Sequence, residues 1–275
     1  MWVVPHRRMS RRKGHYPLCE AKDKPVSTTN GMILSGPMCL ILFAVQPTED
    51  LQLVVAANRD EFHQRDTRPA GIWSESPNIL AGKDLAAGGT WLGVTSSGRF
   101  AAVTNFAETP PDPLPPGSRG ALTTNFLNSD ISSKAYLELI QADDGLYRGY
   151  NLLVFDGTEV GYYSNRGGAA QILSPGYYGL SNQLLDCHWP KVNSGRDKLA
   201  TLGPGFSPQE LQALLADRGD SQTPHSARFI LGETYGTRAM TLVHLLDEET
   251  RFEEIGFGPD GEVTGSYQKT LQRQN

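Results

Sequence analysis

The chain of 275 residues has no apolar run of the ~18 residues that a membrane-spanning helix needs, so we expect no integral membrane association. It also has few cysteines, namely Cys19, Cys39 and Cys187. A small, odd number of cysteines does not build a disulfide framework and suits a reducing compartment. We therefore expect a cytoplasmic protein without structural disulfides.

The common cofactor and metal motifs are missing as well. The sequence contains no G-x-G-x-x-G after a strand, no G-x-x-x-x-G-K-[ST], no H-E-x-x-H and no C-x-x-C. Cys187 and His188 are adjacent, which is not the spacing of metal ligands. These absences predict that the protein holds neither a metal ion nor a bound cofactor.

Charge is distributed unevenly along the chain. Residues 1–37 carry seven basic and two acidic side chains, a net charge of +5, so the rest sums to −10 within the formal total of −5. An acidic body speaks against nucleic-acid binding. The basic segment has no apolar stretch typical of a secretory signal, and a transit peptide would need an amphipathic helix that is not visible. We expect a disordered leader over 1–37 and one domain over 38–275.

The apolar pattern after Met38 predicts mainly antiparallel strands. Runs at 39–45 and 51–57 flank a turn and predict a hairpin. Residues 58–89 are polar and dotted with Pro and Gly, which predicts a long functional loop. Further strands are expected at 90–94, 100–105, 150–155, 159–165, 240–246 and 252–257, and a surface loop at 110–117.

Helices are expected in three places, at 120–143, 189–202 and 208–218. Since βαβ alternation is missing, we predict an α+β fold of mainly antiparallel sheets with helices packed on them. The positions expected to be buried on the helices are Leu122, Phe126, Tyr136, Leu137, Ile140, Leu211, Leu214 and Leu215.

Cys39 directly follows an internal methionine at the start of a strand. If Met38 were the effective start and were removed, Cys39 would be the first residue. Its thiol would then be a nucleophile and its α-amine, with a pKa of about 7.7–8.0, a general base. One residue would supply both groups without a catalytic histidine. The alternative is an ordinary buried thiol at the start of an apolar strand.

A polar cluster, Asn58-Arg59-Asp60-Glu61, ends the second strand. Hairpin pairing would bring this cluster near the Cys39 sulfur. An arginine beside a thiol favours the thiolate, and a carboxylate could hold the α-ammonium. The alternative is a solvated turn with an internal ion pair.

Three further polar residues lie at strand ends. Asn105 and Asn182 could donate side-chain N–H groups to a developing oxyanion, and Arg238 could bind a substrate carboxylate or support the cysteine. Asn and Arg are also common at such positions for turn and capping reasons.

Several ordered stretches resemble the NRDE family, also called the transport and Golgi organisation 2 family. The resemblance runs from Met38 to about residue 260 and is carried by Met38–Phe43, Asn58–Phe62, Gly88–Gly93, Thr104–Phe106, Gly149–Leu153, Gly179–Asn182 with Trp189–Val192, and Gly236–Arg238.

This resemblance implies an N-terminal nucleophile (Ntn) hydrolase fold, a four-layer αββα sandwich of two antiparallel sheets. It implies Cys39 as nucleophile, Asn182 as an oxyanion donor and Arg238 as the later arginine. Asn58, Arg59 and Asp60 occupy the region of the early Arg and Asp of the cysteine amidases, although in those enzymes the two are not adjacent. Asn58 and Asn105 are the expected substrate-binding residues.

The leading hypothesis is therefore a cysteine hydrolase or acyltransferase that acts on a small non-peptide amide or a thioester through an acyl-enzyme on Cys39. The alternative is a non-catalytic carrier of haem or a lipid-like ligand, since the resemblance also implies haem trafficking and a Cys thiolate can be an axial ligand. A scaffold without a small-molecule site is a third option, disfavoured because charged and amide residues collect at strand ends.

Overall fold

The computed structural model describes residues 38–108, 117–203 and 205–273, and it contains two antiparallel sheets. The predicted leader at 1–37 and nearly all of the predicted loop at 110–117 lie outside the described residues. The first sheet has the strand order β10 (Gly176–Leu180), β1 (Leu40–Val45), β2 (Leu51–Phe62), β11 (Tyr235–Leu246), β12 (Glu249–Phe257) and β13 (Val263–Gln272).

The second sheet is built largely from the middle of the chain. Its strand order is β3 (Thr67–Ile72), β4 (Ile79–Asp84), β5 (Leu92–Thr95), β6 (Phe100–Asn105), β7 (Tyr150–Phe155), β8 (Val160–Ser164) and β9 (Gln171–Ile172). All neighbouring pairs are antiparallel, and most are joined by hairpins. The predicted dominance of antiparallel hairpins is confirmed.

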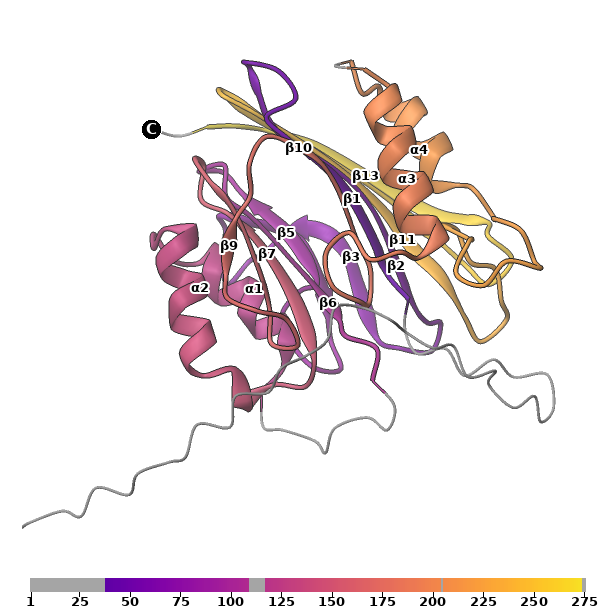
Figure 1. Cartoon of the computed structure of the whole chain (residues 1–275), viewed down its shortest axis with the longest axis horizontal. Helices are drawn as coiled ribbons and strands as arrows, with labels where there is room; N and C mark the ends of the chain where they lie inside the picture. The colour runs from indigo at the N-terminus through magenta and orange to yellow at the C-terminus, as the bar shows by residue number, and fades with distance from the viewer. Residues whose placement is uncertain (1–37, 109–116, 204, 274–275) are drawn as a thin grey trace, which may run out of the picture. The chain divides into compact units, whose positions relative to one another are not determined.

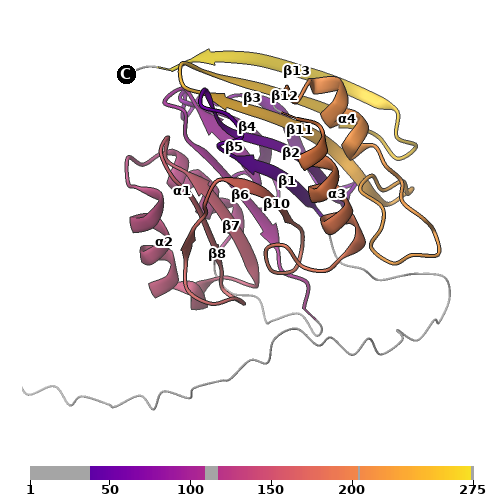
Figure 2. The same ribbon diagram turned by 45° about the horizontal axis from the view of Figure 1, so that its top comes forward.

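Helices cover the outer face of each sheet (Figures 1 and 2). Helices α1 (Arg119–Leu127) and α2 (Ser133–Ala142) pack on the second sheet, followed by a short 3-10 turn at Asp144–Leu146. Helices α3 (Pro190–Thr201) and α4 (Pro208–Leu215) pack on the first sheet. The four-layer αββα sandwich is thereby confirmed, and the helix positions predicted to be buried are buried.

Strand β1 is apolar on both faces because it lies between two cores. Ile41 and Phe43 pack between the sheets, whereas Leu40 and Leu42 pack against the α3–α4 layer. Side chains alternate along a strand, so a central strand of a four-layer fold reads as a continuous apolar run. The same alternation places Cys39 on the side of Ile41, between the sheets.

The predicted loop over 58–89 is wrong. Strand β2 extends through Phe62, and β3 and β4 follow it. The polar end of β2 is held by pairing with β11, in which Thr237 lies opposite Asp60. Strand β3 is an edge strand containing Pro69, which gives it the local composition of a loop. Long-range pairing therefore made strands where local composition suggested a loop.

Candidate active site

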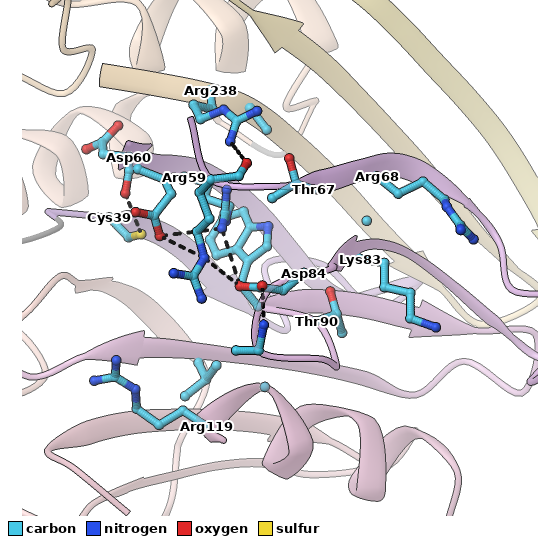
Figure 3. A pocket seen from close by; sticks show the side chains of 18 of the residues that line it. Cys39, Arg59, Asp60, Thr67, Arg68, Lys83, Asp84, Thr90, Arg119 and Arg238 are labelled. Atoms are coloured by element: carbon cyan, nitrogen blue, oxygen red, sulfur yellow. Dashed lines mark hydrogen bonds and ion pairs between the residues drawn. The ribbon is translucent and has the colours of Figure 1, made fainter. Parts of the chain in front are cut away.

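A cavity of about 560 Å³ lies between the ends of the two sheets (Figure 3). Cys39, Arg59, Asp60, Asn105 and Arg238 are among its lining residues, so the structure brings five of the predicted site residues to one cavity. The other walls come from β3, β4, β12 and the start of α1. Strands, rather than the predicted loop, therefore enclose the space next to Cys39.

Cys39 lies at the buried end of this cavity. Leu40 pairs with Asn58, which places Cys39 opposite the polar end of β2, as hairpin pairing predicts. Its Sγ–H donates a long hydrogen bond of 3.8 Å to the backbone oxygen of Asp60. Burial, reinforced by the Asp60 charge, raises the pKa of the Cys39 thiol to about 11. Arg59 acts in the direction expected from the sequence and lowers this pKa, but burial outweighs it.

The carboxyl group of Asp60 is buried, with 1% of the residue exposed. Its Oδ1 accepts a hydrogen bond of 2.6 Å from Thr237 Oγ1, whereas its buried Oδ2 has no partner among the described residues. Burial raises the pKa of Asp60 to about 7, against the lowering effects of Lys191, Thr237 and Arg59. This carboxyl group therefore titrates near neutral pH, and one of its oxygens is available to accept a hydrogen bond.

The residue before Cys39 is held by three contacts. Met38 N donates to Tyr235 Oη at 2.6 Å, and Met38 O accepts from Lys191 Nζ at 2.8 Å. The ring nitrogen of His225 lies 3.3 Å from Met38 Sδ. Lys191 has no exposed surface, and burial lowers its pKa while Asp60 and Cys39 raise it. The peptide bond between Met38 and Cys39 is thus fixed beside Lys191.

Arg59 points into the cavity from the opposite face of β2 to Asp60, because adjacent strand residues alternate. It lies 3.5 Å from a Glu61 oxygen and 3.8 Å from an Asp84 oxygen. Arg65 contacts the same two carboxylates, with 2.8 Å between Nε and Asp84 Oδ2. Two arginines and two carboxylates therefore form a network on the cavity wall (Figure 3).

Arg238 lines the cavity from β11 and ties down the end of β2. Its Nη1 donates to the backbone oxygens of Phe62, at 3.2 Å, and Arg65, at 2.5 Å. It makes no ion pair within the described residues, although the charge of Glu61 acts on its pKa. Asn105, at the end of β6, lines the same space.

Asn58 and Asn182 are not among the residues that line the cavity. Asn58 Nδ2 donates to Leu215 O at 3.0 Å and to Arg228 O at 2.7 Å, on the α4 side of the sheet. Asn182 Nδ2 donates to the backbone oxygen of Asn105 at 2.9 Å. Asn182 therefore supports the residue that reaches the cavity, and its role as an oxyanion donor stays a prediction.

Several polar residues of the site were not singled out from the sequence. They are Tyr235, Thr237, Lys191, Asp84 and Arg119. Lys191 and Thr237 lie within stretches that carry the family resemblance, and this resemblance is the sequence signal that could have identified them as site residues. Asp84 and Arg119 follow segments of loop-like composition, so only the tertiary structure brings them to the cavity.

Within the described residues, no three His, Cys, Asp or Glu side chains are grouped to hold a metal ion. None of the described helices combines the length and apolar composition needed to cross a lipid bilayer. No histidine of the described segments lines the cavity. The ionisable groups at the cavity are therefore the Cys39 thiol, carboxylates, arginines and a lysine.

The chain is similar to known proteins over most of this region. The family model described as Transport and Golgi organisation 2 matches residues 38–255. The chain is 40% identical over 172 residues to the Transport and Golgi organization 2 homolog of Mus musculus, and the human homolog gives the same identity. The match covers 58% of this chain and 62% of each mammalian protein.

The chain also has more distant similarities. Transport and Golgi organization protein 2 of Drosophila melanogaster is 25% identical over 197 residues, which is 65% of this chain and 70% of the fly protein. A solved structure, the Caenorhabditis elegans N-acylethanolamine-hydrolyzing acid amidase ortholog, aligns with a TM-score of 0.40 and 12% identity, covering 74% of this chain and 92% of that one. The predicted family is confirmed: the chain belongs to the Transport and Golgi organisation 2 family.

Proposed function

We propose that this protein is a cysteine-dependent amidohydrolase or acyltransferase that acts on a small amide or thioester, with Cys39 Sγ as nucleophile. The observation that carries the proposal is the buried Asp60 carboxyl group beside Cys39, with one oxygen held by Thr237 and the other without a described partner. The α-amino group of Cys39, as an amine or as an ammonium, is the kind of donor that this oxygen lacks.

The base in this proposal is the α-amine of Cys39, which exists only when Cys39 is the first residue. With Met38 attached, that nitrogen is a peptide N–H, and the thiol pKa is about 11. Once Met38 is removed, the Lys191 ammonium loses the carbonyl that it now contacts. A buried positive charge lowers the pKa of a neighbouring amine, which favours the neutral base form.

The chemical step then balances within these groups. The α-amine takes the thiol proton as Sγ attacks the substrate carbonyl, and the resulting ammonium gives that proton to the leaving amine or thiol. The acyl group remains on Cys39 as a thioester until water or an acceptor amine attacks it. Asn105, which lines the cavity, and Asn182 behind it are the proposed oxyanion donors.

The experiment compares three chains that start at Met38. They are the parent sequence, the Cys39→Ala variant and a control variant, Cys187→Ala. Intact mass first establishes whether Cys39 is the first residue. We expect turnover of short acyl amides or thioesters, and an acyl adduct on Cys39, in the parent and the control but not in Cys39→Ala. The chain that retains residues 1–38 should be inactive. Equal turnover by Cys39→Ala would overturn the proposal.

The carrier alternative has less support. No described histidine lines the cavity, so Cys39 is the one lining side chain of the described residues that resembles an axial haem ligand. The many charged groups of the lining also do not match an acyl chain alone.

A further inference from the structure

The cavity carries an excess of positive charge that its own carboxylates do not balance. The described lining residues include seven cations and four carboxylates: Arg59, Arg65, Arg68, Lys83, Arg119, Arg148 and Arg238 against Asp60, Glu61, Asp84 and Glu254. Glu61 and Asp84 are already bound by Arg59 and Arg65, and Lys83 pairs with Glu75 outside the cavity. A ligand with a negative charge would correct this imbalance.

Two of the remaining arginines, Arg119 and Arg148, line the same part of the cavity, because Arg119 contacts Gly149, the residue that follows Arg148. Arg119 is the first residue of α1, and its Nη1 donates only to the backbone oxygen of Gly149, at 3.1 Å, within the described chain. Burial and the charge of Arg148 lower the pKa of Arg119. The Nε of Arg148 is buried without a described partner. The cavity wall thus carries two guanidinium groups without a carboxylate partner among the described residues, and an anion would provide one.

No described acidic group is available to neutralise this pair. Glu108, whose charge acts on Arg119, receives hydrogen bonds from Arg166 Nε at 3.0 Å and from Gly149 N at 2.9 Å. The first turn of α1 contains no acidic residue, and Ser118 makes no side-chain cap, so the partial positive charge of the helix start adds to that of the arginines.

Both arginines line the cavity that contains the proposed nucleophile. Figure 3 shows Arg119 entering the cavity from α1, across from Arg59 and on the side of Cys39. Arg119 and Cys39 line the same cavity, so a single ligand can contact both. An anion bound here would occupy the same cavity as a carbonyl group at Sγ.

We propose that Arg119 and Arg148 form an anion-binding subsite beside Cys39 that takes a carboxylate or phosphate group of the ligand. A planar guanidinium presents paired N–H donors that match the oxygens of either group. The substrate class implied is a small amide or thioester with an anionic group near the reacting carbonyl. This substrate assignment rests on the proposed function, whereas the subsite itself does not.

The test measures binding to the full chain carrying Cys39→Ala, which cannot turn over a substrate through the thiol. The calorimetric probes are N-hexanoylglycine, its neutral analogue N-hexanoylglycinamide, and N-hexanoylphosphoethanolamine. We expect the carboxylate to bind about tenfold to a hundredfold more tightly than the neutral amide, the range for a hydrogen-bonded charge. Tighter binding of the phosphate compound would identify phosphate as the preferred group.

The arginine variants locate the effect. Arg119→Gln should abolish the preference for the anion, Arg148→Gln should reduce it, and Arg119→Lys should keep part of it. Arg68→Gln is the matched control, because Arg68 lines the same cavity with an exposed side chain. Equal affinity for the anionic and neutral probes, no binding of any probe, or an equal loss in Arg68→Gln would overturn the subsite. Anion binding without turnover in the chain that starts at Cys39 would instead count against the proposed function.

Discussion

The Lys191 ammonium contacts the carbonyl oxygen of Met38 at 2.8 Å, while its charge also lowers the pKa of the buried Asp60 carboxyl group. Replacement of Lys191 by Met keeps an unbranched side chain but removes this charge. We expect the Lys191→Met variant to raise the pKa of Asp60 above its value of about 7. A ¹³C NMR titration of the Asp60 carboxyl carbon measures the shift.

The control for that titration is Lys198→Met, an exposed position on the same helix, α3. It should leave the Asp60 titration unchanged. An Asp60 midpoint that falls, or that shifts equally in both variants, would show that Lys191 does not control this carboxyl group.

The buried Asp60 carboxyl group should make stability depend on pH. Its pKa is about 7 in the folded protein and 3.8 in a model peptide, so the folded state binds the proton more tightly. The resulting stabilisation is present below about pH 4 and is lost as the pH rises to about 7, at about 1.4 kcal/mol for each unit of pKa difference. Thermal unfolding at several pH values should show this loss.

The Asp60→Asn variant removes the titration while its side-chain oxygen can still accept from Thr237. We expect it to be more stable than the parent at pH 8, by a few kcal/mol, and to show no such gain at pH 4. Asp50→Asn is the same substitution at an exposed position and should be neutral at both pH values. A pH-independent effect of Asp60→Asn would contradict the raised pKa.

Cys39 should be unreactive while Met38 is attached. A thiol with a pKa of about 11 is less than about one per cent thiolate at pH 8, and Cys39 is buried whereas Cys187 is partly exposed. Mass spectrometry after brief iodoacetamide treatment should find Cys187 alkylated well before Cys39. Arg59→Gln should slow Cys39 further, and Arg68→Gln should not. An alkylation midpoint for Cys39 below pH 9 would be inconsistent with this environment.

The fold was largely predictable because the apolar runs of its central strands come from burial on both faces. The strand over 100–105 and the strand over 150–155 were predicted with their observed bounds. Strands β3, β4, β9, β10 and β13 were not predicted. Pro69 in β3, the glycine and tyrosine content of β10 and the exposed side chains of β13 carry no apolar alternation. Their pairing partners, not their own composition, make them strands.

The candidate site was predictable only where hairpin pairing fixes it. The pairing of β1 with β2 places Cys39 next to Arg59 and Asp60. Asn58 was expected to bind substrate, yet the alternation of side chains along β2 directs it toward α4. The sequence does not show which face of the strand lines the cavity, so this placement needed the structure. Lys191 and Arg119 come from helices distant in sequence, so no local pattern could join them to Cys39.

Asn58 should therefore matter for stability rather than for ligand binding. Its Nδ2 satisfies two backbone oxygens in a buried position, and Asn58→Ala would leave both without that donor. We expect a loss of about 2–4 kcal/mol in the free energy of unfolding, measured by urea denaturation. Asn78→Ala, at an exposed turn, is the control. A stable Asn58→Ala protein that binds N-hexanoylglycine more weakly would instead support the prediction that Asn58 binds substrate.

Gly89 should not tolerate a side chain. Its φ is +77°, and an added Cβ would lie 2.4 Å from Gly120 O, next to Arg119. Gly88 has a similar φ of +75°, but nothing lies within 4 Å of an added Cβ. We expect Gly88→Ala to cost about 1 kcal/mol and Gly89→Ala more than about 2 kcal/mol in thermal unfolding. Equal costs would mean that the contact with Gly120 is not rigid.

Strand β2 presents the Arg59 side chain to one side and the Asp60 side chain to the other, so two neighbouring residues contact different layers of the fold. Changes in the α3 layer, where Lys191 lies, can alter the protonation of Asp60 without changing the shape of the chamber that receives a ligand. Changes in α1, which supplies none of the groups that act on the pKa of Asp60, can alter which ligands fit without disturbing that protonation. Within one scaffold, selectivity and acid–base behaviour can therefore vary independently in evolution.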